Sequence, residues 1–111
     1  MTLNEKIKKV RDCLTPVCEN VYHYWRLEKD YPCIVWQEDS EIDQSFDGDN
    51  HRCEQAIHGT VDLFTRTEFD QLADDVQDAL DSAEFVAWRL NSVQYEDETN
   101  LIHYEWEFEV M

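Results

Sequence analysis

The first fourteen residues repeat apolar side chains with the spacing of an amphipathic helix. Steps of four, three and four residues form one apolar stripe, made of Leu3, Ile7, Val10 and Leu14. Lys6, Lys9 and Asp12 fall outside this stripe and are expected to face water. Pro16 should end the helix, because proline lacks an amide hydrogen and disfavours helical geometry at the preceding residue. The pattern therefore predicts a helix over residues 3–14.

Two short segments that follow are rich in β-branched and aromatic residues, which favour strands. The first covers residues 21–27, and the second covers residues 33–36, after a break that ends at Pro32. Residues 38–51 contain six acidic side chains and an Asp-Gly turn signal, but they have neither helical nor alternating periodicity. They are predicted to form a long acidic loop.

Residues 53–64 alternate between apolar and polar positions, which predicts a long strand with a plausible bulge at Gly59. Thr65 and Glu68 then have the spacing of a capping box, in which both side chains satisfy free amide hydrogens at the start of a helix. A second helix is therefore predicted from Glu68 to Leu80, with aspartates along its outer side.

The end of the chain has the pattern of a β-hairpin. A strand is predicted over residues 85–95, a turn over 96–100 and a last strand over 101–111. In the last strand, apolar and polar residues alternate strictly, so one face should be core and the other hydrated. The order of elements predicts an α+β fold with a mainly antiparallel sheet of four to five strands and two helices packed on one face. A length of 111 residues fits one domain over residues 1–111.

Charge narrows the possible functions. The chain carries 26 acidic and 9 basic residues and a net charge of −17, which repels the phosphate backbone of nucleic acids. Residues 1–11 are the exception, because four basic residues against Glu5 leave +3 there and −20 on the rest. The basic residues are a candidate subunit interface, made of Lys6, Lys8, Lys9 and Arg11. The alternative is that they only solvate one side of a helix.

Carboxylates on the second helix and the last strand form a candidate acidic surface. Its members are Asp74, Asp75, Asp78, Glu105, Glu107 and Glu109. Most of the helical aspartates lie too far from the start of the helix to be explained by its dipole.

No catalytic, cofactor-binding or metal-binding motif stands out in the sequence. The four cysteines, with gaps of 5, 15 and 20 residues, match no zinc pattern and are expected to be buried free thiols. The four histidines have no helical ligand spacing and are expected to be structural or surface residues. A Gly-rich phosphate loop and an apolar run of about 20 residues that could span a membrane are both absent. We therefore expect neither an enzyme nor a cofactor.

The order of motifs resembles the small tail-completion, or tail-terminator, proteins of long-tailed bacteriophages and prophages. The resemblance is carried by the first helix ended by Pro16, the strand entry Tyr31–Trp36, the strand end Val61–Thr65, the helix Glu68–Leu80 and the last strand up to Val110. It spans nearly the whole chain.

The resemblance implies a structural virion subunit without catalytic residues. Its relatives assemble into a ring, six copies in the best-known cases, that ends growth of the tail tube and joins the tail to the head connector. It also implies assembly in the bacterial host cytoplasm, contacts with tail-tube and head-completion proteins, and passage of DNA without specific binding. Two alternatives remain at this point: a head-tail adaptor or other minor virion protein, and an acidic DNA-mimic inhibitor of a nucleic-acid-binding protein.

Overall fold

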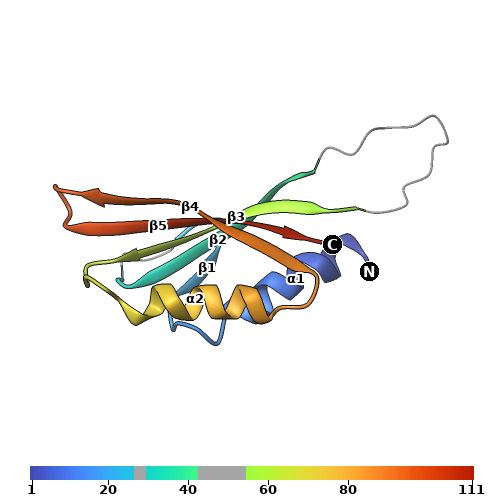
Figure 1. The fold of residues 1–111 in the computed structure, drawn as a ribbon, viewed down its shortest axis with the longest axis horizontal. Coiled ribbons are helices and arrows are strands. Elements are labelled where there is room, and N and C mark those ends of the chain that lie inside the picture. The colour runs from blue at the N-terminus through green and yellow to red at the C-terminus, as the bar shows by residue number, and fades with distance from the viewer. Residues whose placement is uncertain (27–29, 43–54) are drawn as a thin grey trace.

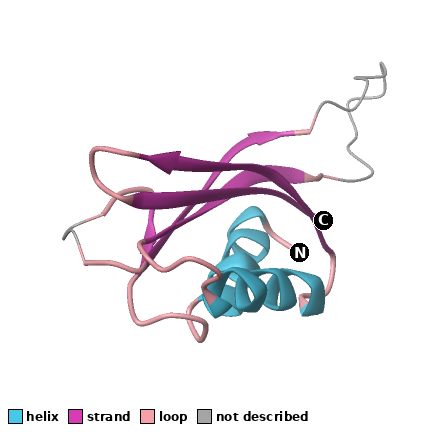
Figure 2. Ribbon diagram, turned by 60° about the vertical axis from the view of Figure 1, so that its left-hand side comes forward, coloured by secondary structure: helices cyan, strands magenta, loops and turns pink. Residues whose placement is uncertain are grey.

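A computed structural model describes residues 1–26, 30–42 and 55–111. The described chain forms two helices and five strands, and both helices lie on one face of the sheet (Figure 1; Figure 2). In chain order the elements are α1 (Leu3–Leu14), β1 (Val21–His23), β2 (Cys33–Glu41), β3 (Ile57–Thr65), α2 (Gln71–Ser82), β4 (Val86–Glu96) and β5 (Leu101–Val110). The predicted α+β class is confirmed. We call the helix-covered side of the sheet the inner face and the other side the outer face.

The sheet has the strand order β1-β2-β3-β5-β4. The pairs β2–β3, β3–β5 and β4–β5 are antiparallel, whereas β1 pairs with β2 in parallel. The sheet is thus mixed, although mainly antiparallel as predicted. Strand β3 takes the central position, and β4 forms one edge.

The core lies between the inner face of the sheet and the two helices. Trp106 and Phe108 of β5 are each only 1% exposed, and they alternate with carboxylates on the outer face. Residues Val10 and Leu14 of α1 and Val76 and Leu80 of α2 are fully buried in the same cluster. The indole Nε1 of Trp106 donates a hydrogen bond of 3.0 Å to Oε1 of Gln77, which satisfies its buried polar atom and ties β5 to α2.

The bulge between β2 and β3 lies in β2, not at Gly59 as the alternation predicts, and a second register shift lies in β4 between Leu90 and Ser92. The register between β2 and β3 shifts between Glu38 and Ser40, so Asp39 is the extra residue. Gly59 has a different role, because a Cβ there would lie 2.2 Å from the carbonyl oxygen of Gln37 and 2.3 Å from the Phe108 ring. The glycine lets that ring pack against the backbone of the central strand.

The first helix has the predicted bounds but buries one of its lysines. Thr2 caps its start by accepting a hydrogen bond from the amide of Glu5. The prediction that Lys6 faces water is wrong, since this residue is only 7% exposed. Its ammonium group donates a 2.7 Å hydrogen bond to the carbonyl of Gln55, a satisfied arrangement for a buried charged end.

The second helix begins three residues later than predicted. Asp70, and not Thr65, is its N-cap, and its carboxylate accepts a 2.9 Å hydrogen bond from the amide of Leu72. The fully buried Thr65 instead donates a 2.6 Å hydrogen bond to the other oxygen of Asp70 and accepts one from the amide of Thr67. The predicted capping box is therefore wrong, but Thr65 still supports the cap from one step away.

Two strand boundaries also differ from the expectation. The strand predicted over residues 21–27 is formed only by the three residues of β1. Strand β2 continues through Glu41, so the first part of the predicted acidic loop is in fact paired with β3. The rest of that loop, residues 43–51, and the predicted strand start at residues 53–54 lie outside the described residues.

We expect the substitution Gly59→Ala to lower the free energy of unfolding by about 1–3 kcal/mol or more, because the new methyl group overlaps both backbone and Phe108. Urea unfolding would measure the loss. The neighbouring Thr60→Ala change, on the outer face, is the control and should cost less. A Gly59→Ala midpoint equal to that of the native chain would contradict the close packing of Phe108 and Gln37 against Gly59.

Candidate functional site

The outer face of the sheet is covered by alternating charged and polar side chains. Strand β3 contributes His58, Thr60 and Asp62, and β5 contributes Glu105, Glu107 and Glu109. These residues occupy the face opposite the core because side chains alternate along each strand.

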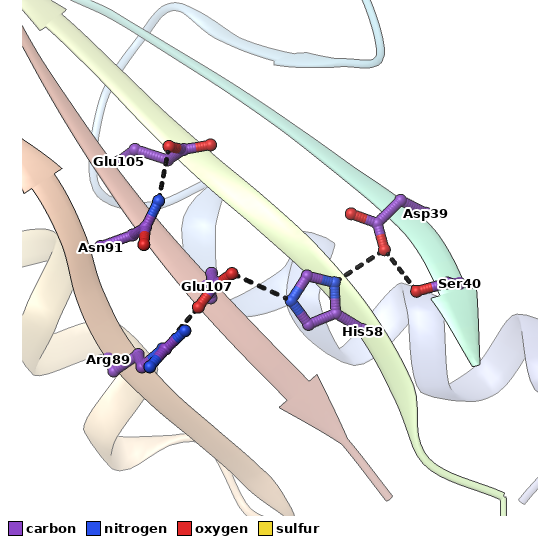
Figure 3. Close-up of polar contacts among 7 residues, drawn as sticks. All are labelled: Asp39, Ser40, His58, Arg89, Asn91, Glu105 and Glu107. Atoms are coloured by element: carbon purple, nitrogen blue, oxygen red, sulfur yellow. Dashed lines mark hydrogen bonds and ion pairs between the residues drawn. The ribbon is translucent and has the colours of Figure 1, made fainter. Parts of the chain in front are cut away.

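A chain of charged contacts crosses four strands on this face (Figure 3). Nδ1 of His58 lies 2.7 Å from Oδ1 of Asp39, and its Nε2 lies 3.5 Å from Oε1 of Glu107. Glu107 also accepts a 2.5 Å hydrogen bond from Nε of Arg89. The bulge at Asp39 brings its carboxylate toward β3, so the order of contacts runs from β2 through β3 and β5 to β4.

These contacts shift two pKa values. Burial alone would lower the pKa of His58, but the hydrogen bond that it donates to Asp39 and the negative charges of Asp39 and Glu107 outweigh burial and raise the pKa. The hydrogen bond from Arg89 holds the pKa of Glu107 below its ordinary value. The network therefore favours a charged histidine and a charged carboxylate.

A second pair on the same face works in the same way. Nε2 of His103 lies 2.7 Å from Oδ1 of Asp62, and the imidazole stacks on the Phe64 ring with centroids 4.4 Å apart. The hydrogen bond to Asp62 outweighs burial and raises the pKa of His103. Histidine and arginine charges thus offset part of the carboxylate charge on the outer face.

The six residues of the candidate acidic surface do not form one surface. Asp74 and Asp78 are exposed on α2 and Asp75 is half-buried there, on the helix side of the sheet. Glu105, Glu107 and Glu109 lie on the outer face, where Glu105 accepts a 3.0 Å hydrogen bond from Asn91 (Figure 3). Carboxylates are therefore presented on both sides of the molecule.

The candidate basic interface is smaller than the sequence suggested. Lys6 is buried, as described above, whereas Lys8 and Arg11 are exposed. Arg11 lies 2.9 Å from the carboxylate of Asp12. The ammonium group of Lys9 lies 5.1 Å from the centroid of the exposed Phe85 ring, a cation–π geometry.

The three described cysteines carry free thiols. Cys33 is buried, and Cys13 and Cys18 are half-buried. Burial, assisted by the charge of Asp12, raises the pKa of Cys13 to about 11, and burial also raises the pKa of Cys33. Both thiols therefore stay protonated near neutral pH, which is unfavourable for a nucleophile or a metal ligand. Within residues 1–26, 30–42 and 55–111, no group of three or more His, Cys, Asp or Glu side chains is arranged to hold a metal ion.

Sequence reasoning missed a set of exposed apolar residues. Leu90, Val93 and Tyr95 of β4 point to the inner face, opposite Trp106, Tyr104 and Ile102, yet they are 45%, 51% and 59% exposed. An apolar, aromatic strand is normally assigned to the core, so periodicity alone gave no reason to expect exposure. The place of this strand in the chain could have indicated its exposure, because the first strand of a C-terminal hairpin can form a sheet edge.

These surfaces belong to a small acidic α+β protein that exposes both charged and apolar side chains. None of the described helices is long and apolar enough to cross a membrane. A family model described as "Tail completion protein gp17" matches residues 7–111. The chain belongs to this phage tail completion family, as the resemblance had indicated, and is a structural component of the phage tail. No curated protein matches the chain.

The His103–Asp62 pair predicts a pH-dependent contribution to stability. Because the pKa of His103 is raised above 6.5 in the folded chain, its stabilisation is fully present below pH 6.5 and is lost as the pH rises through the folded pKa. We expect Asp62→Asn to cost about 1 kcal/mol of unfolding free energy at pH 6 and clearly less at pH 9. Urea unfolding at both pH values measures this difference, with Thr60→Ser on the same face as the control.

Proton NMR titration of the imidazole gives an independent readout. The pKa of His103 should fall in Asp62→Asn and remain raised in Thr60→Ser. An equal cost of Asp62→Asn at pH 6 and pH 9, together with an unmoved titration, would refute the ion pair.

Proposed function

We propose that this protein forms an oligomeric ring that ends tail-tube growth and joins the tail to the head. We propose six copies in the ring, the number in the best-known tail-terminator proteins that the sequence resembles. The observation that carries the proposal is the match of residues 7–111 to the tail completion family. In this role the protein contacts the tail-tube protein on one side and a head-completion or connector protein on the other. It works as one domain through surface contacts without catalysis, is assembled in the bacterial host cytoplasm and remains in the virion.

Passage of DNA through the ring is favoured by the charge of the subunit. A phosphate contact would create a salt-sensitive binding site that holds DNA in place, whereas carboxylates repel phosphate. Acidic side chains occur both on α2 and on the outer face of the sheet. Either side of the subunit can therefore line the channel without binding DNA.

Assembly must overcome repulsion between copies that each carry −17. Head-to-tail contacts in a closed ring use two different patches on every subunit. The exposed basic residues Lys8 and Arg11 supply one patch that can meet an acidic neighbour. Apolar contacts have to supply much of the remaining affinity, because the net charge opposes association.

The alternatives are a head-tail adaptor and a DNA-mimic inhibitor. The family match favours tail completion over an adaptor attached elsewhere in the virion. A DNA mimic requires carboxylates spaced like phosphates on one surface, whereas the candidate acids here are divided between α2 and the outer face.

The role in the virion is tested by disabling the gene in the phage that encodes it. We expect electron micrographs of the lysate to show filled heads separate from tails, with tails that vary in length. Supplying the native chain from a plasmid should restore joined particles and raise the infectious titre. Normally joined, infectious particles without the gene product would refute the proposed function.

Ring formation predicts a salt-dependent solution mass. Because salt screens repulsion between acidic copies, a species of about 80 kDa, six times the 13.3 kDa chain, should increase with protein concentration and with salt. Light scattering coupled to size exclusion measures this mass. A species of another fixed size would contradict the hexamer while leaving the ring intact.

A further inference from the structure

One end of the molecule combines exposed apolar residues with acidic charge. The β4–β5 hairpin extends beyond the start of α2 (Figure 1), and the inner side of β4 is exposed from Leu90, near the middle of the strand, to Tyr95 near the turn. We call this the tip end: it comprises the exposed apolar residues Leu90, Val93 and Tyr95 and the exposed turn residues Asp97 and Glu98.

Two further features complete the tip end. Arg66 donates a 3.4 Å hydrogen bond to the carbonyl of Thr99 in the same turn, which reduces but does not cancel the acidic excess. Phe69, just before α2, is 90% exposed and has a φ of 55°, a left-handed conformation that is unfavourable for a bulky side chain. Strained backbone conformations cluster at functional sites, so Phe69 is a candidate contact residue.

The opposite end combines exposed apolar residues with basic charge. Helix α1 and both chain termini lie at the far end from the hairpin turn (Figure 1), and the described chain is about 52 Å long and 25 Å wide. The amide of Met111 donates a 3.0 Å hydrogen bond to the carbonyl of Phe85, so these two residues, 43% and 62% exposed, are adjacent. Lys9 lies over the Phe85 ring, and Lys8 and Arg11 are exposed on α1. We call this set the helix end. The nearby carboxylates of Asp12, 2.9 Å from Arg11, and Glu84 offset part of this basic charge.

We propose that the tip end of one copy docks on the helix end of the next copy of this chain. The apolar residues of β4 would cover Phe85 and Met111, while Asp97 and Glu98 would face Lys8 and Arg11. A second copy is the occupant that fits, because the tip end has an acidic excess, the helix end presents exposed cations, and both ends carry exposed apolar residues. The two surfaces differ, and the hairpin turn lies at the opposite end of the long axis from the chain termini (Figure 1), which is the arrangement of a head-to-tail contact.

This inference rests on the proposed ring and adds which two surfaces join its subunits. Charge reversal tests it, with Asp97→Lys/Glu98→Lys at the tip end and Lys8→Glu/Arg11→Glu at the helix end. Each double variant places like charges against each other, so we expect association to weaken more than about tenfold. The chain that carries all four changes keeps the net charge of −17 and should associate like the native chain.

The matched control is Asp74→Lys/Asp78→Lys on α2, which changes the net charge as much as the tip variant does. Because it only relieves repulsion, it should associate at least as well as the native chain. Native-like association of the tip variant, or failure of the four-change chain while its fold is intact by circular dichroism, would overturn the docking proposal. If the native chain is monomeric in solution, the same variants are compared by the infectious titre they restore to the phage lacking the gene.

Phe69→Asn separates a contact role from a structural role. Asparagine tolerates the left-handed backbone, so the thermal midpoint of the variant should be unchanged or higher. Association, or restored titre, should nevertheless fall about tenfold. A lower thermal midpoint with unchanged assembly would show that Phe69 serves the fold instead of the interface. If the charge-reversal variants assemble like the native chain, and the native chain restores joined particles to the phage lacking the gene, only the proposed contact is refuted. Joined particles in the absence of the gene would refute the ring itself.

Discussion

The packing of Trp106 and Phe108 against the two helices is the constraint on which the rest of the structure depends. It fixes which face of β5 is buried, and since β5 pairs with both β3 and β4, it also fixes the faces of those strands. Gly59 has no side chain because the Phe108 ring occupies that space. The register of β5 also determines the charged outer face. A shift of this register by one residue would bury Glu105 and Glu107 in place of Trp106 and Phe108.

The charged outer face is consistent with a very acidic chain that still folds. Carboxylates opposite one another on neighbouring strands repel, as Asp62 and Glu105 do in the register of β3 and β5. Histidines with raised pKa values and Arg89 stand among these carboxylates and offset part of the repulsion. In the described part of this face, the contacts of histidine and arginine with carboxylates therefore stabilise the pairing of the strands. The carboxylates of this face are not simply unpaired negative charges on the surface.

Local patterns in the sequence were sufficient for some elements and insufficient for others. Helix α1 and strand β5 were predicted with nearly correct bounds, because each has a strong period of its own. The burial of Lys6 depends on the carbonyl of Gln55, 49 residues away, and no local pattern contains that contact. The extension of β2 through Glu41 likewise depends on pairing with β3. At the start of α2, Thr65 and Asp70 can both act as caps, and only the backbone path decides between them.

The apolar edge strand β4 shows how fold and assembly are connected. An exposed sheet edge with apolar side chains invites uncontrolled association, and proteins usually protect such edges with charge. Here the protection is positioned at the hairpin turn, where Asp97 and Glu98 would repel an identical tip. The same carboxylates attract a basic surface, so charge would select a helix end over another tip end. Under the proposed docking, a strongly acidic subunit can therefore expose an apolar edge and still associate in one direction only, because exposed cations on α1 offer a surface that the tip carboxylates attract.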